Sequence, residues 1–194
     1  QQYYSCFTKS QGCMEDSLSA EAGILPARNL FRHEVPELDD IIPHIHRACL
    51  NGHLNLVKTL LETRKSYINE LDPANQTALH YVTSFHERTE MLKYLLEEGA
   101  DPNVCDFAGA TPLHNLVRLG GGRQIEILLN FKVRPVNLNL QNVEGNTPLH
   151  LAVLLNKPDI VTILIEAGAN LNVLNCEMLT PLVIAKKRSL LTII

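Results

Sequence analysis

The chain has 194 residues, and its eight histidines are the residues that could bind a metal ion or transfer protons. A histidine pair binds a metal ion well when both rings lie on one helix face, for example at positions i and i+4. His44 and His46 lie two residues apart and point away from each other on a helix, and the sequence contains no HExxH. Three further histidines, His80, His114 and His150, recur with His46 at one position of a repeated tetrapeptide. The repeat therefore explains the histidines better than a metal or catalytic site does.

Motifs for phosphate binding and nucleophilic catalysis are also absent from the sequence. Gly120, Gly121 and Gly122 form no GxGxxG motif and are not followed by the Lys-Ser/Thr of a P-loop, so we interpret them as a turn. No GxSxG motif occurs either. We predict that the chain is not an enzyme and that it uses no cofactor and no metal.

Charge and hydropathy exclude two further classes of function. The 17 Lys and Arg residues against 21 Asp and Glu give a formal net charge of −4, which argues against binding to a nucleic acid backbone. No apolar run approaches the ~20 residues that cross a bilayer, so we expect no direct membrane contact. The five cysteines form no CxxC pair, which favours reduced thiols and a location in the cytoplasm, the nucleus or both.

The sequence elements that must position the recurring histidines repeat about every 34 residues. The tetrapeptide at 111–114, Thr-Pro-Leu-His, returns unchanged at 147–150, with variants at 77–80 and 180–183 and a weaker form at 43–46. Threonine is a good helix N-cap, and proline suits the first helical turn. An apolar pair follows in each of the first four blocks: Leu60-Leu61, Leu95-Leu96, Leu128-Leu129 and Leu164-Ile165. Each block therefore predicts two short helices that bury one face against their neighbours.

These coupled markers resemble those of the ankyrin repeat. The resemblance implies an all-α solenoid of helix–turn–helix units with β-hairpin-like turns, in which the repeated histidine bonds to the motif threonine and nearby backbone. We place a non-repetitive extension or cap at 1–38 and an ankyrin-repeat array at 39–194. The predicted units of the array are 39–72, 73–105, 106–141, 142–174 and a partial one at 175–194.

The two ends of the chain carry separate expectations. Within the extension, Asn29-Leu30-Phe31 could pack on the first unit. At the other end, residues 190–194 are apolar where a terminal unit should turn polar, so we expect the parent protein to continue.

The resemblance also implies where a partner would bind, namely the tips of the turns, or fingers, and the concave face formed by the first helices. The predicted partner-binding residues are Phe107, Val143, Glu144 and Glu177 at the tips and Phe85, Arg118, Leu119 and Leu155 on the concave face. Large apolar and Arg side chains are typical anchors of protein interfaces. The alternative for Phe85 and Leu119 is a place in the core.

The function that we predict is a non-catalytic protein–protein interaction module, an adaptor or scaffold, within a larger intracellular protein, monomeric as a fragment. The fourth unit also looks like a repeat from inhibitors of Rel/NF-κB transcription factors, which makes such an inhibitor one alternative. A substrate-recruiting domain of a larger enzyme, such as a ubiquitin ligase, is the other. In addition, Asn103 and Asn172 stand in the context seen in asparagine-hydroxylated repeats, eight residues after Leu95 and Leu164.

Overall fold

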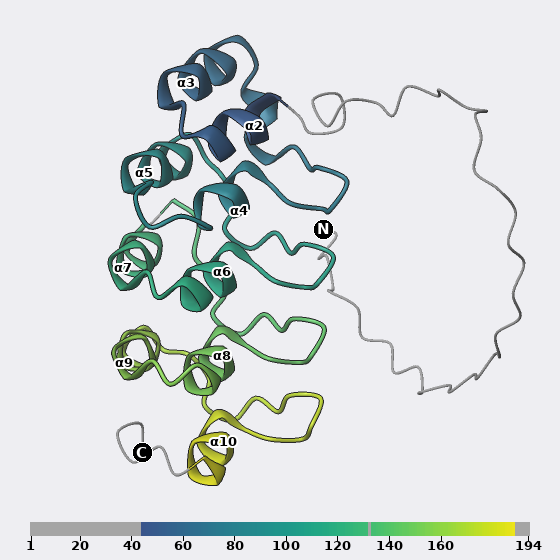
Figure 1. The fold of residues 1–194 in the computed structure, drawn as a ribbon, viewed down its shortest axis with the longest axis vertical. Helices are drawn as coiled ribbons and strands as arrows, with labels where there is room; N and C mark the ends of the chain where they lie inside the picture. The colour runs from purple at the N-terminus through teal and green to yellow at the C-terminus, as the bar shows by residue number, and fades with distance from the viewer. Residues whose placement is uncertain (1–43, 132, 189–194) are drawn as a thin grey trace, which may run out of the picture.

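The computed structural model describes residues 44–131 and 133–188 as two columns of short helices joined by projecting fingers (Figure 1). The first column contains the first helix of each unit: α2 (His44–Asn51), α4 (Ala78–Val82), α6 (Pro112–Leu119), α8 (Pro148–Leu154) and α10 (Pro181–Lys187). The second contains α3 (Leu54–Thr63), α5 (Thr89–Glu97), α7 (Gly122–Asn130) and α9 (Pro158–Glu166). A 3₁₀ helix, η1 (Lys65–Asn69), follows α3. No residue in the described ranges is in a β-strand.

The repeated threonines begin the helices of the first column, as the sequence predicts. Thr111 adopts an extended conformation, and its hydroxyl accepts a hydrogen bond from the backbone N–H of His114. In return, His114 Nδ1 accepts a hydrogen bond from the backbone N–H of Thr111, at 3.1 Å. Thr147 and His150 form the same reciprocal pair. The motif thus satisfies backbone donors that a helix start would otherwise leave unpaired.

A single apolar core runs the length of the stack between the two columns. Leucines from successive units fill it, and each is almost completely buried: Leu61, Leu79, Leu95, Leu113, Leu128, Leu149 and Leu164. Because each unit buries its apolar face only against its neighbours, stability comes from the interfaces between units as well as from the units themselves.

The first helix of the second unit is shorter than its counterparts. Helix α4 ends at Val82, whereas α6 extends to Leu119. The hydroxyl of Thr83 donates to the carbonyl oxygens of Leu79 and His80, at 2.9 and 3.0 Å, and Ser84 also donates to His80. The last two carbonyls of α4 accept from the backbone N–H groups of Ser84 and Phe85. The chain then turns through Phe85 before α5 begins at Thr89.

Each complete helix pair lies within one predicted unit, and α10 lies within the partial one. The predicted unit boundaries themselves stay a prediction. The predicted extension at 1–38, with its Asn29–Phe31 segment, and the apolar end at 190–194 lie outside the described residues.

Candidate partner-binding surface

Four histidines connect each unit to the finger of the next. The Nε2 atoms of His46, His80, His114 and His150 lie 2.9 to 3.2 Å from the backbone carbonyl oxygens of Gln76, Ala110, Asn146 and Leu179, respectively. In the last three, Nδ1 accepts from a threonine N–H, so Nε2 carries the proton and donates. We call this set the histidine ladder.

Burial controls the protonation of the histidine ladder. Desolvation lowers the pKa of all four imidazoles below the usual value, and it lowers the pKa of His114 to about 4. The rings are therefore neutral at pH 7 and serve as hydrogen-bond bridges. The first unit has Pro43 where the others have threonine, and His46 Nδ1 is buried without a partner. The histidines connect successive units, as the sequence predicts for a structural role.

Backbone hydrogen bonds join the four fingers, 72–76, 106–110, 142–146 and 175–179, into one ribbon. Phe107 N donates to Ala74 O, Val143 N donates to Ala108 O, and Cys176 N donates to Glu144 O, at distances of 2.9 to 3.2 Å. Within a finger, the side chain of Asp106 accepts from the N–H groups of Ala108 and Ala110 and holds the turn. Figure 1 shows the fingers projecting in parallel from the same side of the stack.

The finger residues predicted from the sequence all lie on the exposed side of this ribbon. Phe107 and Val143 occupy the same position in successive fingers, and their exposed fractions are 75% and 68%. Glu144 and Glu177 are exposed beside them. Met178, which was not predicted from the sequence, is 71% exposed at the tip of finger 175–179 and has a positive φ of 58°. Met178 takes the position that Gly109 and Gly145 hold in other fingers, and this departure from the repeat was its only signal.

The residues predicted for the concave face differ in exposure. Arg118 and Leu155 are exposed, Leu119 is half-buried, and Phe85 has 37% of its surface exposed. The Arg88 guanidinium covers the ring of Phe85 at 3.8 Å from its centroid. Phe85 and Leu119 are therefore not fully buried in the core, although neither is as exposed as Phe107. Their role in binding stays a prediction.

The carboxyl ends of the first helices accept hydrogen bonds from long polar side chains that belong to the following unit. Lys157 Nζ donates to the carbonyl oxygens of Val117 and Arg118, at 3.0 and 2.7 Å. Three other side chains donate in the same way. Arg88 donates to the carbonyl oxygens of Cys49 and Leu50, Gln124 donates to that of Phe85, and Arg188 donates to that of Leu154. Cations at this end of a helix also interact favourably with its dipole. These bonds fix the turns that carry Phe85, Arg118 and Leu155.

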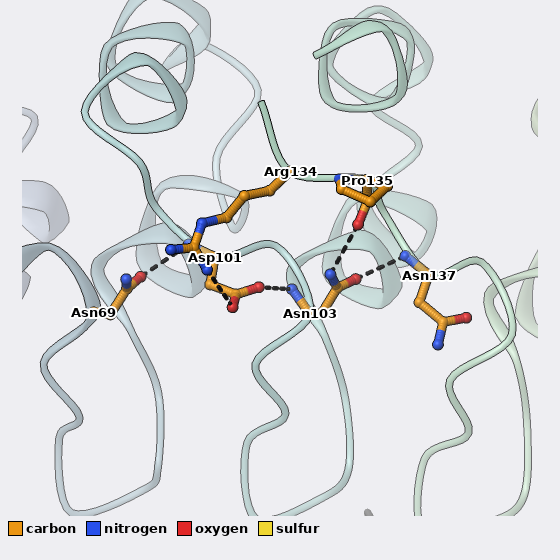
Figure 2. A network of polar contacts seen from close by, with 6 residues as sticks. All are labelled: Asn69, Asp101, Asn103, Arg134, Pro135 and Asn137. Atoms are coloured by element: carbon orange, nitrogen blue, oxygen red, sulfur yellow. Dashed lines mark hydrogen bonds and ion pairs between the residues drawn. The ribbon is translucent and has the colours of Figure 1, made fainter. Parts of the chain in front are cut away.

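A network of asparagines fixes the ends of the fingers that lie opposite their tips (Figure 2). The Asn103 side chain donates to Pro135 O at 2.9 Å and accepts from Asn137 N at 2.7 Å, so it joins the second and third units. Arg134 forms an ion pair with Asp101 at 3.0 Å, and Asp101 in turn accepts from Asn103 N. Asn69 accepts from Asp101 N in the same manner. Asn172, by contrast, is an exposed residue in the finger-side turn after α9. Hydroxylation of Asn103 and Asn172 stays a prediction.

The described residues offer little support for other kinds of site. Within 44–131 and 133–188, no three His, Cys, Asp or Glu residues are grouped so that they could hold a metal ion. None of the helices in these ranges is both long and apolar enough to cross a bilayer. Burial raises the pKa of the Cys49 thiol to about 12, which makes Cys49 a core residue rather than a nucleophile.

A stack of helix pairs with projecting fingers and a repeated Thr-Pro-Leu-His motif defines an ankyrin-type solenoid. A model of ankyrin repeats, in three copies, matches residues 45–132, 85–175 and 122–193. The chain therefore belongs to the ankyrin-repeat family, whose repeats are non-catalytic modules for protein–protein interaction. The predicted family and the predicted all-α solenoid are both confirmed.

Three relatives illustrate how widely these repeats are used. The chain is 29% identical over 126 residues to human transient receptor potential cation channel subfamily A member 1, across 64% of this chain and 11% of that protein. It is 29% identical over 133 residues to the chicken nuclear factor NF-kappa-B p105 subunit, across 66% and 13%. It is 30% identical over 154 residues to the mouse B-cell lymphoma 3 protein homolog, across 77% and 34%. The chain thus spans about a third or less of the length of each of these relatives.

Proposed function

We propose that the chain is a rigid adaptor or scaffold segment of a larger protein, which binds a partner protein across its finger tips and the adjoining first helices. The observation that carries this proposal is the exposure of Phe107 and Val143 at one position of neighbouring fingers. An ordinary solvated tip would carry polar residues there. Exposed apolar side chains on a rigid surface are typical of protein interfaces.

The hydrogen bonds around these residues favour binding without a large rearrangement. The Val143 finger bonds to the preceding finger through Ala108 and to the following one through Cys176, and Asn142 holds its turn. A side chain on such a support loses little conformational freedom when it binds. The partner would gain affinity from Phe107 and Val143, and Arg118 and Leu155 would extend the contact onto the helices.

The charge of the fingers favours a partner with cationic groups. The four fingers contain Asp72, Asp106, Glu144 and Glu177 and no Lys or Arg. Glu144 is exposed, and its carboxylate accepts from Asn146 Nδ2 at 2.8 Å, which holds it beside Val143. Charge complementarity at such a rim raises the association rate and improves the discrimination between partners.

A Rel/NF-κB-type transcription factor is the second candidate partner. The similarity to the NF-kappa-B p105 subunit favours it. The similarity to the cation channel is of the same size, so these relatives do not select one parent protein. We propose a location in the cytoplasm, the nucleus or both. The substrate-recruiting role in a larger enzyme stays an alternative.

Affinity capture from a cell extract, quantified by mass spectrometry, tests the proposed function. The baits are the wild-type chain, Phe107→Ala and the control Ile165→Ala, which truncates a 44% exposed residue of α9 outside the fingers. We expect proteins that are captured by wild type and by Ile165→Ala but are lost with Phe107→Ala. Equal capture by all three baits would contradict a finger-tip interface.

A further inference from the structure

A group of cations surrounds the turn between α6 and α7 and continues to the next unit. Arg118 lies in the last turn of α6 and Arg123 in the first turn of α7, and both side chains are exposed. Lys157 reaches the same turn, because its Nζ atom donates to Arg118 O at 2.7 Å. Arg188 makes a similar contact one unit further on, to Leu154 O at 2.7 Å. Because α6 and α8 are neighbours in the first column (Figure 1), we treat these four cations as one surface, the basic turn patch.

Arg123 departs from the charge that the start of a helix favours. The second residue of α5 is Glu90 and that of α9 is Asp159, and both suit the positive end of the helix dipole. Helix α7 has Arg123 at this position and no acidic residue in its first turn. In the part of the chain that the structure describes, the side chains of Arg118 and Arg123 form no hydrogen bond or ion pair. Arg123 therefore destabilises the start of α7, and no ion pair compensates for it.

The basic turn patch has unused donors for an anionic group. An ammonium group has three N–H donors, and Lys157 uses two of them on Val117 O and Arg118 O. A guanidinium group has five, and the contact of Arg188 with Leu154 O uses one of them. These side chains can therefore bind a carboxylate and keep the contacts that hold the stack together.

Apolar side chains accompany the cations. Leu119 follows Arg118 and is half-buried, and Leu155, two residues before Lys157, is 43% exposed. Cations beside exposed apolar groups match a protein segment that combines acidic and apolar residues. A nucleic acid fits less well, because the four fingers contain four carboxylates and no Lys or Arg, and they would repel a long polyanion.

We propose that the basic turn patch binds an acidic, partly apolar segment of the partner protein. Carboxylates of this segment contact Arg118, Arg123 and Lys157, and its apolar side chains contact Leu119 and Leu155. This inference rests on the proposed function, since Arg118 and Leu155 belong to the surface proposed there. It adds that acidic groups of the partner face the turns while cationic groups face the fingers, so charge fixes the orientation of the partner on the stack.

Selection from a library of random dodecapeptides on the immobilised wild-type chain tests the proposal. We expect the selected peptides to be enriched in Asp and Glu together with large apolar residues. Fluorescence anisotropy then gives the Kd of the strongest peptide for wild type and for Arg118→Gln/Arg123→Gln. The matched control is Lys58→Gln/Arg64→Gln, which removes two exposed cations at α3. We expect at least a tenfold weaker Kd for the first variant, an unchanged Kd for the control, and weaker wild-type binding at high salt.

Thermal unfolding separates binding from stability. Arg123→Glu gives α7 the charge that α5 and α9 have at this position, so we expect it to raise the Tm and to weaken peptide binding. A fall in both the Tm and the affinity would instead indicate a structural role for Arg123 and would overturn the proposal.

Three results of the binding experiment would also overturn the proposal. They are selected peptides without an acidic excess, an equal Kd for wild type and Arg118→Gln/Arg123→Gln, and tighter binding of a single-stranded oligonucleotide than of the peptide. A Kd that Phe107→Ala weakens and the arginine variant does not would remove this inference alone. Failure of the proposed function is seen separately, as equal capture by the three baits described above.

Discussion

The Nε2 atom of His114 lies 3.1 Å from the carbonyl oxygen of Asn146, which belongs to the next finger and is 32 residues away in the sequence. Its other ring nitrogen accepts from Thr111 N. One neutral imidazole therefore begins its own helix and fixes the finger of the following unit, and the same arrangement recurs at His80 and His150.

The histidine ladder predicts that the array loses stability in mild acid. The unfolded chain binds protons near the ordinary histidine pKa of 6.5, whereas the buried imidazoles have lowered pKa values, about 4 for His114. The free energy of unfolding is therefore at its full value above pH 6.5 and falls as the pH decreases from 6.5 toward 4. Urea unfolding midpoints at pH 7.5, 6 and 5 measure this effect, and a midpoint that stays constant over this range would refute it.

Truncation of one ladder histidine should be costly. His114→Ala leaves the N–H of Thr111 and the carbonyl of Asn146 without their partner, and we expect a loss of about 2–4 kcal/mol in the free energy of unfolding. His53→Ala is the control, because His53 is exposed, and it should change the stability by less than ~0.5 kcal/mol. The two losses are compared by urea unfolding at pH 7.5, and similar values would show that the ladder contributes little.

Lys157 should stabilise the interface between the third and fourth units through its ammonium group. Lys157→Met keeps most of the apolar stem but removes the bonds to Val117 O and Arg118 O, and we expect a loss of about 1–2 kcal/mol. Lys186→Met, which removes an exposed cation from α10, is the matched control. Thermal unfolding of both variants measures the difference, and an equal Tm for the two would contradict this role.

Asn103 and Asn172 should respond differently to truncation, although the sequence pairs them as equivalent. Asn103→Ala breaks bonds to Pro135 and Asn137 in the next unit, so we expect urea unfolding to show a loss of about 1–2 kcal/mol in the free energy of unfolding. Asn172→Ala changes an exposed residue, and we expect a smaller loss. Mass spectrometry of protein isolated from cells tests the separate prediction of hydroxylation, and that prediction is wrong if both asparagines are unmodified.

The repeat made much of the fold predictable. Thr111, Thr147 and Thr180 begin helices where the motif places them, because N-capping depends on neighbouring residues in the sequence. The bonds made by Arg88, Gln124, Lys157 and Arg188 were not predicted. Only Arg88 and Lys157 share a position, just before the second helix of their units, and the four residue types differ. The stacking of units brings all four to their carbonyl partners.

The partner-binding surface was less predictable than the fold. The position of Phe107 in a turn indicated an exposed side chain, because a finger has no core to bury it. The sequence left Phe85 open between core and surface, since its exposure depends on how the Arg88 side chain folds over the ring. Met178 was overlooked because its exposure follows from a left-handed turn that other fingers form with Gly or Asn.

The central claim is that exposed side chains at the finger tips bind the partner while the stack supports them. The most direct measurement is the Kd of the captured partner for the wild-type chain and for Phe107→Ala, by titration calorimetry, with the Tm of each protein. The account predicts at least a tenfold weaker Kd for Phe107→Ala with a Tm within about 1 °C of wild type. An unchanged Kd, or a weaker Kd that accompanies a large fall in Tm, would contradict it.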